Sequence, residues 1–218
     1  AGMAVAATSA RHPVEALGSV AAGVGHHTVI EDEDGNLRRV PLVLRYDNVG
    51  VAALAVLVAR HSLHLGQDQV SAQAAPNQVR IGGLNLATDG SGFMRPRFHA
   101  AHGGVPAFPV LSFASVVSGK VPAHSFRDKV VLVGETSDAL GPLRVTTSAG
   151  AMYPVEVLAH SLSAIRQGLV VQRPTWATGA SWGIVLCALV FVALVLPRLS
   201  RWVGGVVSLT LWLVLAVT

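Results

Sequence analysis

The first 173 residues show short apolar runs separated by glycine, proline, aspartate and asparagine. The stretch GHHTVIEDEDGNLRRVPLVLRYD predicts a strand, an acidic turn at Asp34-Gly35 with Asn36, and a second strand over residues 40–44. Residues 78–98 predict further short strands, which are joined by Gly-Gly and Asp-Gly turns. This spacing of apolar runs and turn residues is typical of sheets built from short strands.

Helical spacing of apolar residues appears between these strands. A first helix is predicted from a cap at Asp47 or Asn48 to about residue 63, and a short one from Ser112 to Gly119. A third begins at Pro154 and ends at Gly168. The apolar face of the first helix comprises Val51, Leu54, Ala55 and Val58. The apolar face of the third comprises Val155, Leu158, Ala159, Leu162 and Ile165.

Residues 128–142, DKVVLVGETSDALGP, predict a buried strand over residues 129–133 followed by a polar loop that ends at Gly141-Pro142. Strands and helices that alternate along the chain favour an α/β or α+β domain with a mixed, partly parallel sheet flanked by helices. We therefore expect one such domain over residues 1–173.

The end of the chain has a different pattern. Residues 176–196 form a run of 21 uncharged residues, enough for a helix across a hydrocarbon core of about 30 Å. Residues 197–201 would form a short turn, and residues 202–218 a second, truncated span. Arg198 and Arg201 favour a cytoplasmic turn, with residues 1–175 outside, although Arg166 and Arg173 flank the first span in equal number. A pair of core helices in a soluble protein is the alternative.

Charge is distributed unevenly along the chain. All 12 acids lie at or before Glu156, and up to residue 172 the chain has 13 Lys and Arg, a net charge of about +1. The high isoelectric point of about 10.0 therefore comes largely from the C-terminal end. This pattern argues against a nucleic-acid surface, which would cluster basic side chains on the folded domain. Cys187 lies within the apolar run, as expected for a small hydrophobic residue.

The sequence lacks the motifs of a phosphate-binding loop and of a calcium-binding loop. The loop after Gly134 has no Gly-Lys-Ser/Thr. The acidic turn has Asp32 and Asp34 at calcium-loop spacing, but the first and last ligand positions fall on Ile30 and Pro41. The pairs His61/His64 and His99/His102 have no acid or cysteine at ligand spacing. We predict no catalytic residue, metal or cofactor.

Four blocks of sequence, in order, resemble the CHASE2 family of extracytoplasmic sensor domains in bacterial transmembrane signalling proteins. They are GHHTVIEDEDGNLRRVPLVLRY, FPVLSFASVVSGKVP, DKVVLVGETSDALG and PVEVLAHSL, and the likeness covers roughly residues 23–173. The resemblance implies three membrane helices after the domain, and then a cytoplasmic nucleotide cyclase, kinase or cyclic-di-GMP enzyme. It also implies that residue 1 is an internal start and that the N-terminal part of the domain is missing.

The chain departs from the family pattern near the loop. Pro154 stands where glycine is common, Leu158 where a polar residue is usual, and Pro142-Leu143 where an acid and Thr-Pro often follow. If that loop recognises a ligand in the family, these departures change that recognition or remove it.

A sensory, non-enzymatic input domain is the function that the resemblance implies, with a small molecule or protein as stimulus, membrane lipid around the spans and a possible homodimer. Loops at the carboxyl ends of strands are where open sheets usually bind ligands. The candidate ligand-binding residues are Gly134, Glu135, Thr136, Gly141 and Glu156. Two alternatives stay open: a membrane-anchored hydrolase or transferase that uses Glu135, Asp138 or Glu156, and a structural dimerisation module.

Overall fold

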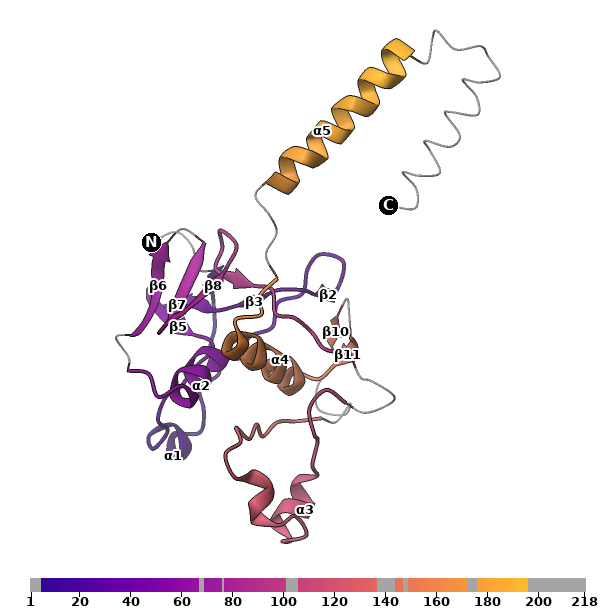
Figure 1. Ribbon diagram of the computed structural model, residues 1–218. Helices are drawn as coiled ribbons and strands as arrows, with labels where there is room; N and C mark the ends of the chain where they lie inside the picture. The colour runs from indigo at the N-terminus through magenta and orange to yellow at the C-terminus, as the bar shows by residue number, and fades with distance from the viewer. Residues whose placement is uncertain are drawn as a thin grey trace. The chain divides into compact units, whose positions relative to one another are not determined.

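The computed structural model describes residues 5–66, 69–75, 77–100, 106–136, 144–146, 149–171 and 176–195. The chain divides into two compact units, residues 1–172 and residues 173–218. The first unit combines several small sheets with short and medium helices, and is a mixed α/β fold (Figure 1). The general prediction of mixed sheets with helices is therefore confirmed for this unit.

The strands of the first unit are short. In the part of the chain that the structure describes they are β1 (Val5–Ala6), β2 (Asn36–Leu37), β3 (Val40–Pro41), β4 (Val43–Tyr46), β5 (Val49–Ala52), β6 (Val70–Ala75), β7 (Gln78–Ile81), β8 (Leu84–Ala87), β9 (Phe93–Met94), β10 (Arg144–Thr146) and β11 (Gly150–Met152). They form sheets in the orders β1-β4-β5, β11-β10-β2, β3-β9 and β6-β7-β8. Two pairings, β1 with β4 and β10 with β2, are parallel, and the others are antiparallel.

The helices of this unit are α1 (Glu15–Gly18), α2 (Leu54–Ser62), α3 (Phe113–Val117) and α4 (Pro154–Gln167), with the 3₁₀ turn η2 (Ala123–Phe126). Helix α3 follows Ser112, as predicted, and Gly119 comes directly after its cap with a positive φ of 71°. A left-handed residue ends a helix by satisfying its last carbonyl groups, and glycine adopts that conformation without steric cost.

Helix α2 begins later than the sequence predicts. Asp47 and Asn48 have positive φ angles of 47° and 62°, and they form the two-residue turn between β4 and β5. Such a hairpin turn requires positive φ at both residues, which Asp and Asn tolerate better than other side chains. The chain therefore turns back before the helix starts. The prediction that Asp47 or Asn48 caps a helix is wrong, whereas the predicted end near residue 63 is confirmed.

Helix α4 follows the prediction at both ends. Pro154 is its first residue, where a missing N–H costs nothing, and Gly168 ends it with a left-handed φ of 65°. The Glu156 carboxylate accepts a hydrogen bond of 2.8 Å from the backbone N–H of Tyr153, which fixes the first turn. The buried face of α4 is wide and consists of Val157, Leu158, His160, Ser161, Leu162, Ala164 and Ile165.

The hydrophobic core lies where α2 and α4 pack together and against the strands. Its fully buried side chains include Val56 of α2, Ile81 of β7 and Ile165 of α4. Burying a side chain of this size stabilises the fold by roughly 1.5–3 kcal/mol. A second cluster joins β2, β11 and the start of α4 through Leu37, Phe98, Met152 and Val157.

The predicted strand at residues 129–133 is not formed. Val130, Val131 and Val133 keep 39%, 53% and 77% of their surface exposed, and only Leu132 of this run packs against the core. Among the described residues, no backbone hydrogen bond joins residues 130–136 to another segment. A strand exists only where a neighbour takes its backbone N–H and C=O groups, however strong its own preference. The prediction of a buried central strand is therefore wrong.

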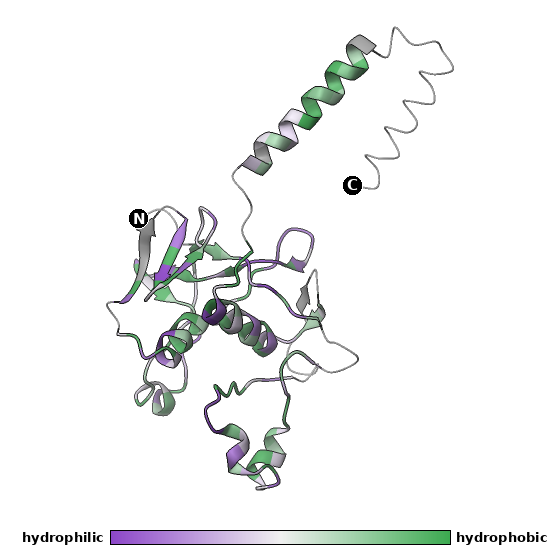
Figure 2. Ribbon diagram, viewed as in Figure 1, coloured by the Kyte–Doolittle hydropathy of each residue, from purple (hydrophilic) through white to green (hydrophobic). Residues whose placement is uncertain are grey.

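The second unit is helical where it is described. Helix α5 (Trp176–Val190) continues into a π-helical turn, η3 (Phe191–Val195), and most of its residues are hydrophobic (Figure 2). Within the described residues, no single helix combines the length and the apolar character that a membrane span requires. The turn at residues 197–201 and the span at residues 202–218 lie outside the described residues. The membrane hairpin thus remains a prediction from the sequence.

Candidate ligand-binding site

The segment Gly25–His26–His27 is held against the junction of β5 and α2. The His26 N–H donates to the Ala52 carbonyl at 3.0 Å, and the Leu54 N–H donates to the His26 carbonyl at 2.8 Å. A Cβ atom on Gly25 would come within 2.9 Å of the Ala52 oxygen and the Leu54 nitrogen. Glycine is therefore required here, and it places His27 beside the start of α2.

The loop that contains Gly134 lies against the first turn of α4. A Cβ atom on Gly134 would be 2.5 Å from the Cβ atom of Val155, far closer than two carbon atoms can approach. The missing side chain thus allows the loop to contact the helix directly. Residues that the sequence separates by about 20 positions are brought together at the N-terminal end of α4.

Between these segments lies an open pocket with a volume of about 280 Å³. It is lined by His27, Leu54, Val133, Gly134, Glu135, Tyr153, Pro154, Val155 and Leu158. The volume is close to the lower end of the range for small-molecule sites, about 300–1,000 Å³. A second cavity, of about 20 Å³, adjoins His26 and His27 and has room for about one water molecule.

The pocket combines apolar walls with a few polar groups. Leu54, Val133, Val155 and Leu158 supply the walls, and His27, Glu135 and Tyr153 the polar groups. Burial lowers the pKa of His27 below its usual value, and the Pro154 carbonyl, facing the ring, opposes this shift in part. His27 is therefore mainly neutral at pH 7. Its neighbour His26 is held at a pKa of about 4 by burial and by the proximity of His27.

The five candidate ligand-binding residues have different positions. Gly134 and Glu135 line the pocket, whereas Thr136 is exposed and does not. Glu156 does not line the pocket either, because its carboxylate is bonded to the N–H of Tyr153. Gly141, like Asp138 of the hydrolase alternative, lies outside the described residues.

His27 and Tyr153 were not among the candidates. The sequence does carry a signal for His27, since a glycine directly before a histidine pair is unusual in a strand and marks a close backbone approach. Tyr153 has no such signal, because only the start of α4 places it at the pocket.

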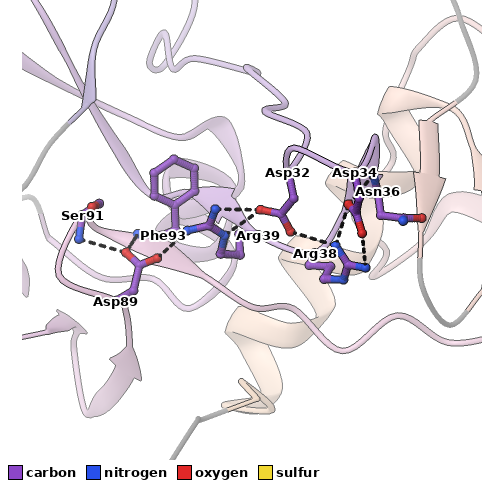
Figure 3. Close-up of polar contacts among 8 residues, drawn as sticks. All are labelled: Asp32, Asp34, Asn36, Arg38, Arg39, Asp89, Ser91 and Phe93. Carbon is purple, nitrogen blue, oxygen red and sulfur yellow. Dashed lines mark hydrogen bonds and ion pairs between the residues drawn. The ribbon is translucent and has the colours of Figure 1, made fainter. Parts of the chain in front are cut away.

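The acidic turn at residues 31–36 holds two arginines (Figure 3). Arg38 contacts Asp34 at 2.6 Å, while Arg39 contacts Asp32 at 2.7 Å and Asp89 at 3.1 Å. The hydrogen bonds from Arg38 keep the pKa of Asp34 well below its usual value. The predicted turn is confirmed, with Gly35 at a φ of 75°. The carboxylates of the turn pair with the two arginines. Arg39 also contacts Asp89, and this contact joins the turn to the segment before β9.

The histidine side chains that the structure describes pack against neighbouring residues and do not converge on one point. His99 stacks on His160 with ring centroids 5.8 Å apart, and Phe108 packs edge-on at 4.8 Å. Burial and the neighbouring His99 lower the pKa of His160 to about 4. In the part of the chain that the structure describes, no three His, Cys, Asp or Glu side chains converge as metal ligands would. His102, the second member of its predicted pair, lies outside that part.

The first unit is thus a mixed α/β fold with a small pocket at the start of α4. The sequence matches the CHASE2 domain family over residues 3–197, and the chain belongs to this family. CHASE2 domains are extracytoplasmic sensory domains of membrane signalling proteins, and the family is sensory rather than catalytic. No curated protein and no solved structure matches the chain.

Proposed function

We propose that residues 1–172 form the sensory input domain of a multi-pass membrane signalling protein, with residues 1–175 outside the cell. The pocket at residues 133–135 receives the stimulus, and α4 carries the response toward the predicted span at residues 176–196. The output is a cytoplasmic cyclase, kinase or cyclic-di-GMP enzyme. Membership of the CHASE2 family supports the sensory role, and the uncharged run at residues 176–196 supports the membrane location.

The observation that carries this proposal is the position of the pocket relative to α4. Val155 and Leu158 of the first turns line the pocket, while the other end of the helix leads through Gly168 to Val171. A helix of 14 residues is about 21 Å long, so it spans the distance between stimulus and exit. A rigid helix passes a displacement at one end to the other, as elements in known switches do.

The exit segment is itself anchored to the sensory unit. Val170 forms an antiparallel bridge with Pro96, and the Val171 N–H donates to the Arg95 carbonyl at 3.0 Å. A shift of α4 would therefore strain or release this bridge just before the connector at residues 173–175. Binding of the stimulus would shift the equilibrium between two packings of α4 toward the packing that binds it more tightly. The size of this shift is set by the difference between the two affinities.

Replacing Arg173-Pro174 by Gly-Ser tests the coupling. Proline is conformationally stiff, whereas a Gly-Ser segment is flexible, so the variant should keep basal output and lose the response to stimulus. The measurement is output activity against stimulus in the full signalling protein. The matched control places Gly-Ser at Ser19-Val20, where the valine is 81% exposed. An unchanged response in the connector variant would contradict the coupling.

A further inference from the structure

The charges around the pocket favour one sign of ligand. Among the described residues, its lining includes one carboxylate, from Glu135, and neither lysine nor arginine. His27 adds little positive charge at pH 7, because partial desolvation of its ring lowers its pKa below the usual value. With one ring nitrogen turned as donor toward the Pro154 carbonyl, the other nitrogen is an acceptor. The pocket is therefore negative and rich in acceptors, which suits a ligand that carries positive charge and N–H donors.

The start of α4 could attract an anion instead, since helix N-termini carry partial positive charge. Here the first turn is largely satisfied. Pro154 has no N–H, and the N–H groups of Glu156 and Val157 both donate to the Tyr153 carbonyl, at 2.9 and 3.1 Å. The Glu156 carboxylate already complements the helix end. An anion would thus gain little from the helix, and Glu135 would repel it.

The remaining surface of the pocket is apolar. Leu54, Val155 and Leu158 form its walls, and Val133, 77% exposed, stands at its edge. Exposed apolar surface next to a single charged group matches a molecule with an apolar body and one polar head. The volume of about 280 Å³ limits that molecule to a small one.

We propose that this pocket binds a small amphipathic cation, an amine in its ammonium form with an apolar body, and that Glu135 is its counter-ion. The ammonium group donates to the Glu135 carboxylate and to the ring nitrogen of His27 that faces away from the Pro154 carbonyl. The apolar body covers Val133, Val155 and Leu158. This inference rests on the proposed sensory function, because it names the class of stimulus that the same pocket would receive.

The direct test compares three probes of similar shape on the full chain: phenethylammonium, phenethyl alcohol and phenylacetate. Isothermal titration calorimetry and ligand-observed NMR measure their binding. Phenethylammonium should bind about threefold to tenfold more tightly than the alcohol, as expected for a charged hydrogen bond in a half-open site. Phenylacetate should bind most weakly. Equal or tighter binding of phenylacetate, or no binding of the cation, would overturn the proposal.

Glu135→Gln removes the charge and keeps the shape. It should weaken phenethylammonium binding by about threefold to tenfold and leave phenethyl alcohol unchanged. Glu33→Gln is the matched control, because Glu33 is exposed in the acidic turn and does not line the pocket. Val133→Ser is a second variant on an exposed side chain, and it should weaken both probes alike. Unchanged cation binding in Glu135→Gln would exclude Glu135 as the counter-ion.

The two proposals fail in different ways. If phenethylammonium binds with the expected dependence on Glu135 and output does not respond, the cation site stands and the sensory coupling falls. If output responds to an anionic or neutral compound whose effect Val133→Ser weakens, the sensory pocket stands and the cation class is wrong.

Discussion

At the scale of single residues, the site depends on two glycines whose missing side chains allow close backbone contact. Gly25 lies against Ala52 and Leu54, and Gly134 lies against Val155. Both glycines are read directly from the sequence, and Gly134 is one of the candidate ligand-binding residues. It does not reveal what each approaches, because the neighbours come from distant parts of the chain. The contacts explain why Glu135 and His27 line the same pocket.

Gly134→Ala should destabilise the first unit. The new methyl group would meet Val155 at 2.5 Å, and overpacking of this kind costs about 1–3 kcal/mol. Urea denaturation measures the loss in free energy of unfolding. Gly83→Ala is the control, since nothing lies within 4 Å of its Cβ position. Val155→Gly removes the Cβ atom that lies 2.5 Å away as well as both Cγ atoms. In that background Gly134→Ala should cost much less, and an undiminished loss would exclude this contact as the cause.

At the scale of elements, the chain forms most of the predicted strands and helices. The strand predicted before the acidic turn is wrong, because that segment forms only an isolated bridge between His26 and Ala53. Asp47 and Asn48 suit a helix cap and a hairpin turn equally, and pairing of β4 with β5 decides for the turn. The run of residues 129–133 has the composition of a strand but lacks a paired neighbour among the described residues. Local preference identifies α4 at both ends because its start and stop signals are local.

Asn48→Val tests the hairpin. Asn48 has a φ of 62°, and a β-branched residue in the left-handed region costs about 1–2 kcal/mol. Asn48→Gly is the matched control, because glycine adopts this conformation freely and should leave the free energy of unfolding unchanged or slightly higher. Chemical denaturation compares the two variants. A valine variant as stable as the glycine variant would show that residue 48 does not adopt the left-handed turn.

At the scale of the whole molecule, buried neutral histidines tie stability to pH. His160 is only 2% exposed, lies between His99 and two phenylalanines, and has its pKa lowered to about 4 by burial. His26 is shifted in the same direction. The unfolded chain, with histidine pKa values near 6.5, therefore binds more protons than the folded chain between about pH 6.5 and pH 4.

Stability should be constant above about pH 6.5 and should fall as the pH drops toward 4, by up to about 1.4 kcal/mol per pH unit for each such histidine. His160→Asn keeps a hydrogen-bond acceptor and removes the titrating ring. It should be less stable than the wild type at pH 7.5, because ring packing is lost, and that difference should narrow toward pH 4. Denaturation curves between pH 7.5 and pH 4 measure the difference in free energy of unfolding between the wild type and the variant. A difference that does not change with pH would contradict the role of His160.

Sequence patterns are enough to identify the family, the α4 helix with its proline start and glycine end, the acidic turn, and the uncharged run at residues 176–196. These features depend on composition and on neighbours within a few positions. The folded chain is needed to show that Glu135 lines a pocket with His27 and Tyr153, whereas the Glu156 carboxylate bonds to the start of α4. A pocket is formed by segments far apart in the chain, and their meeting depends on long-range packing that no local pattern encodes.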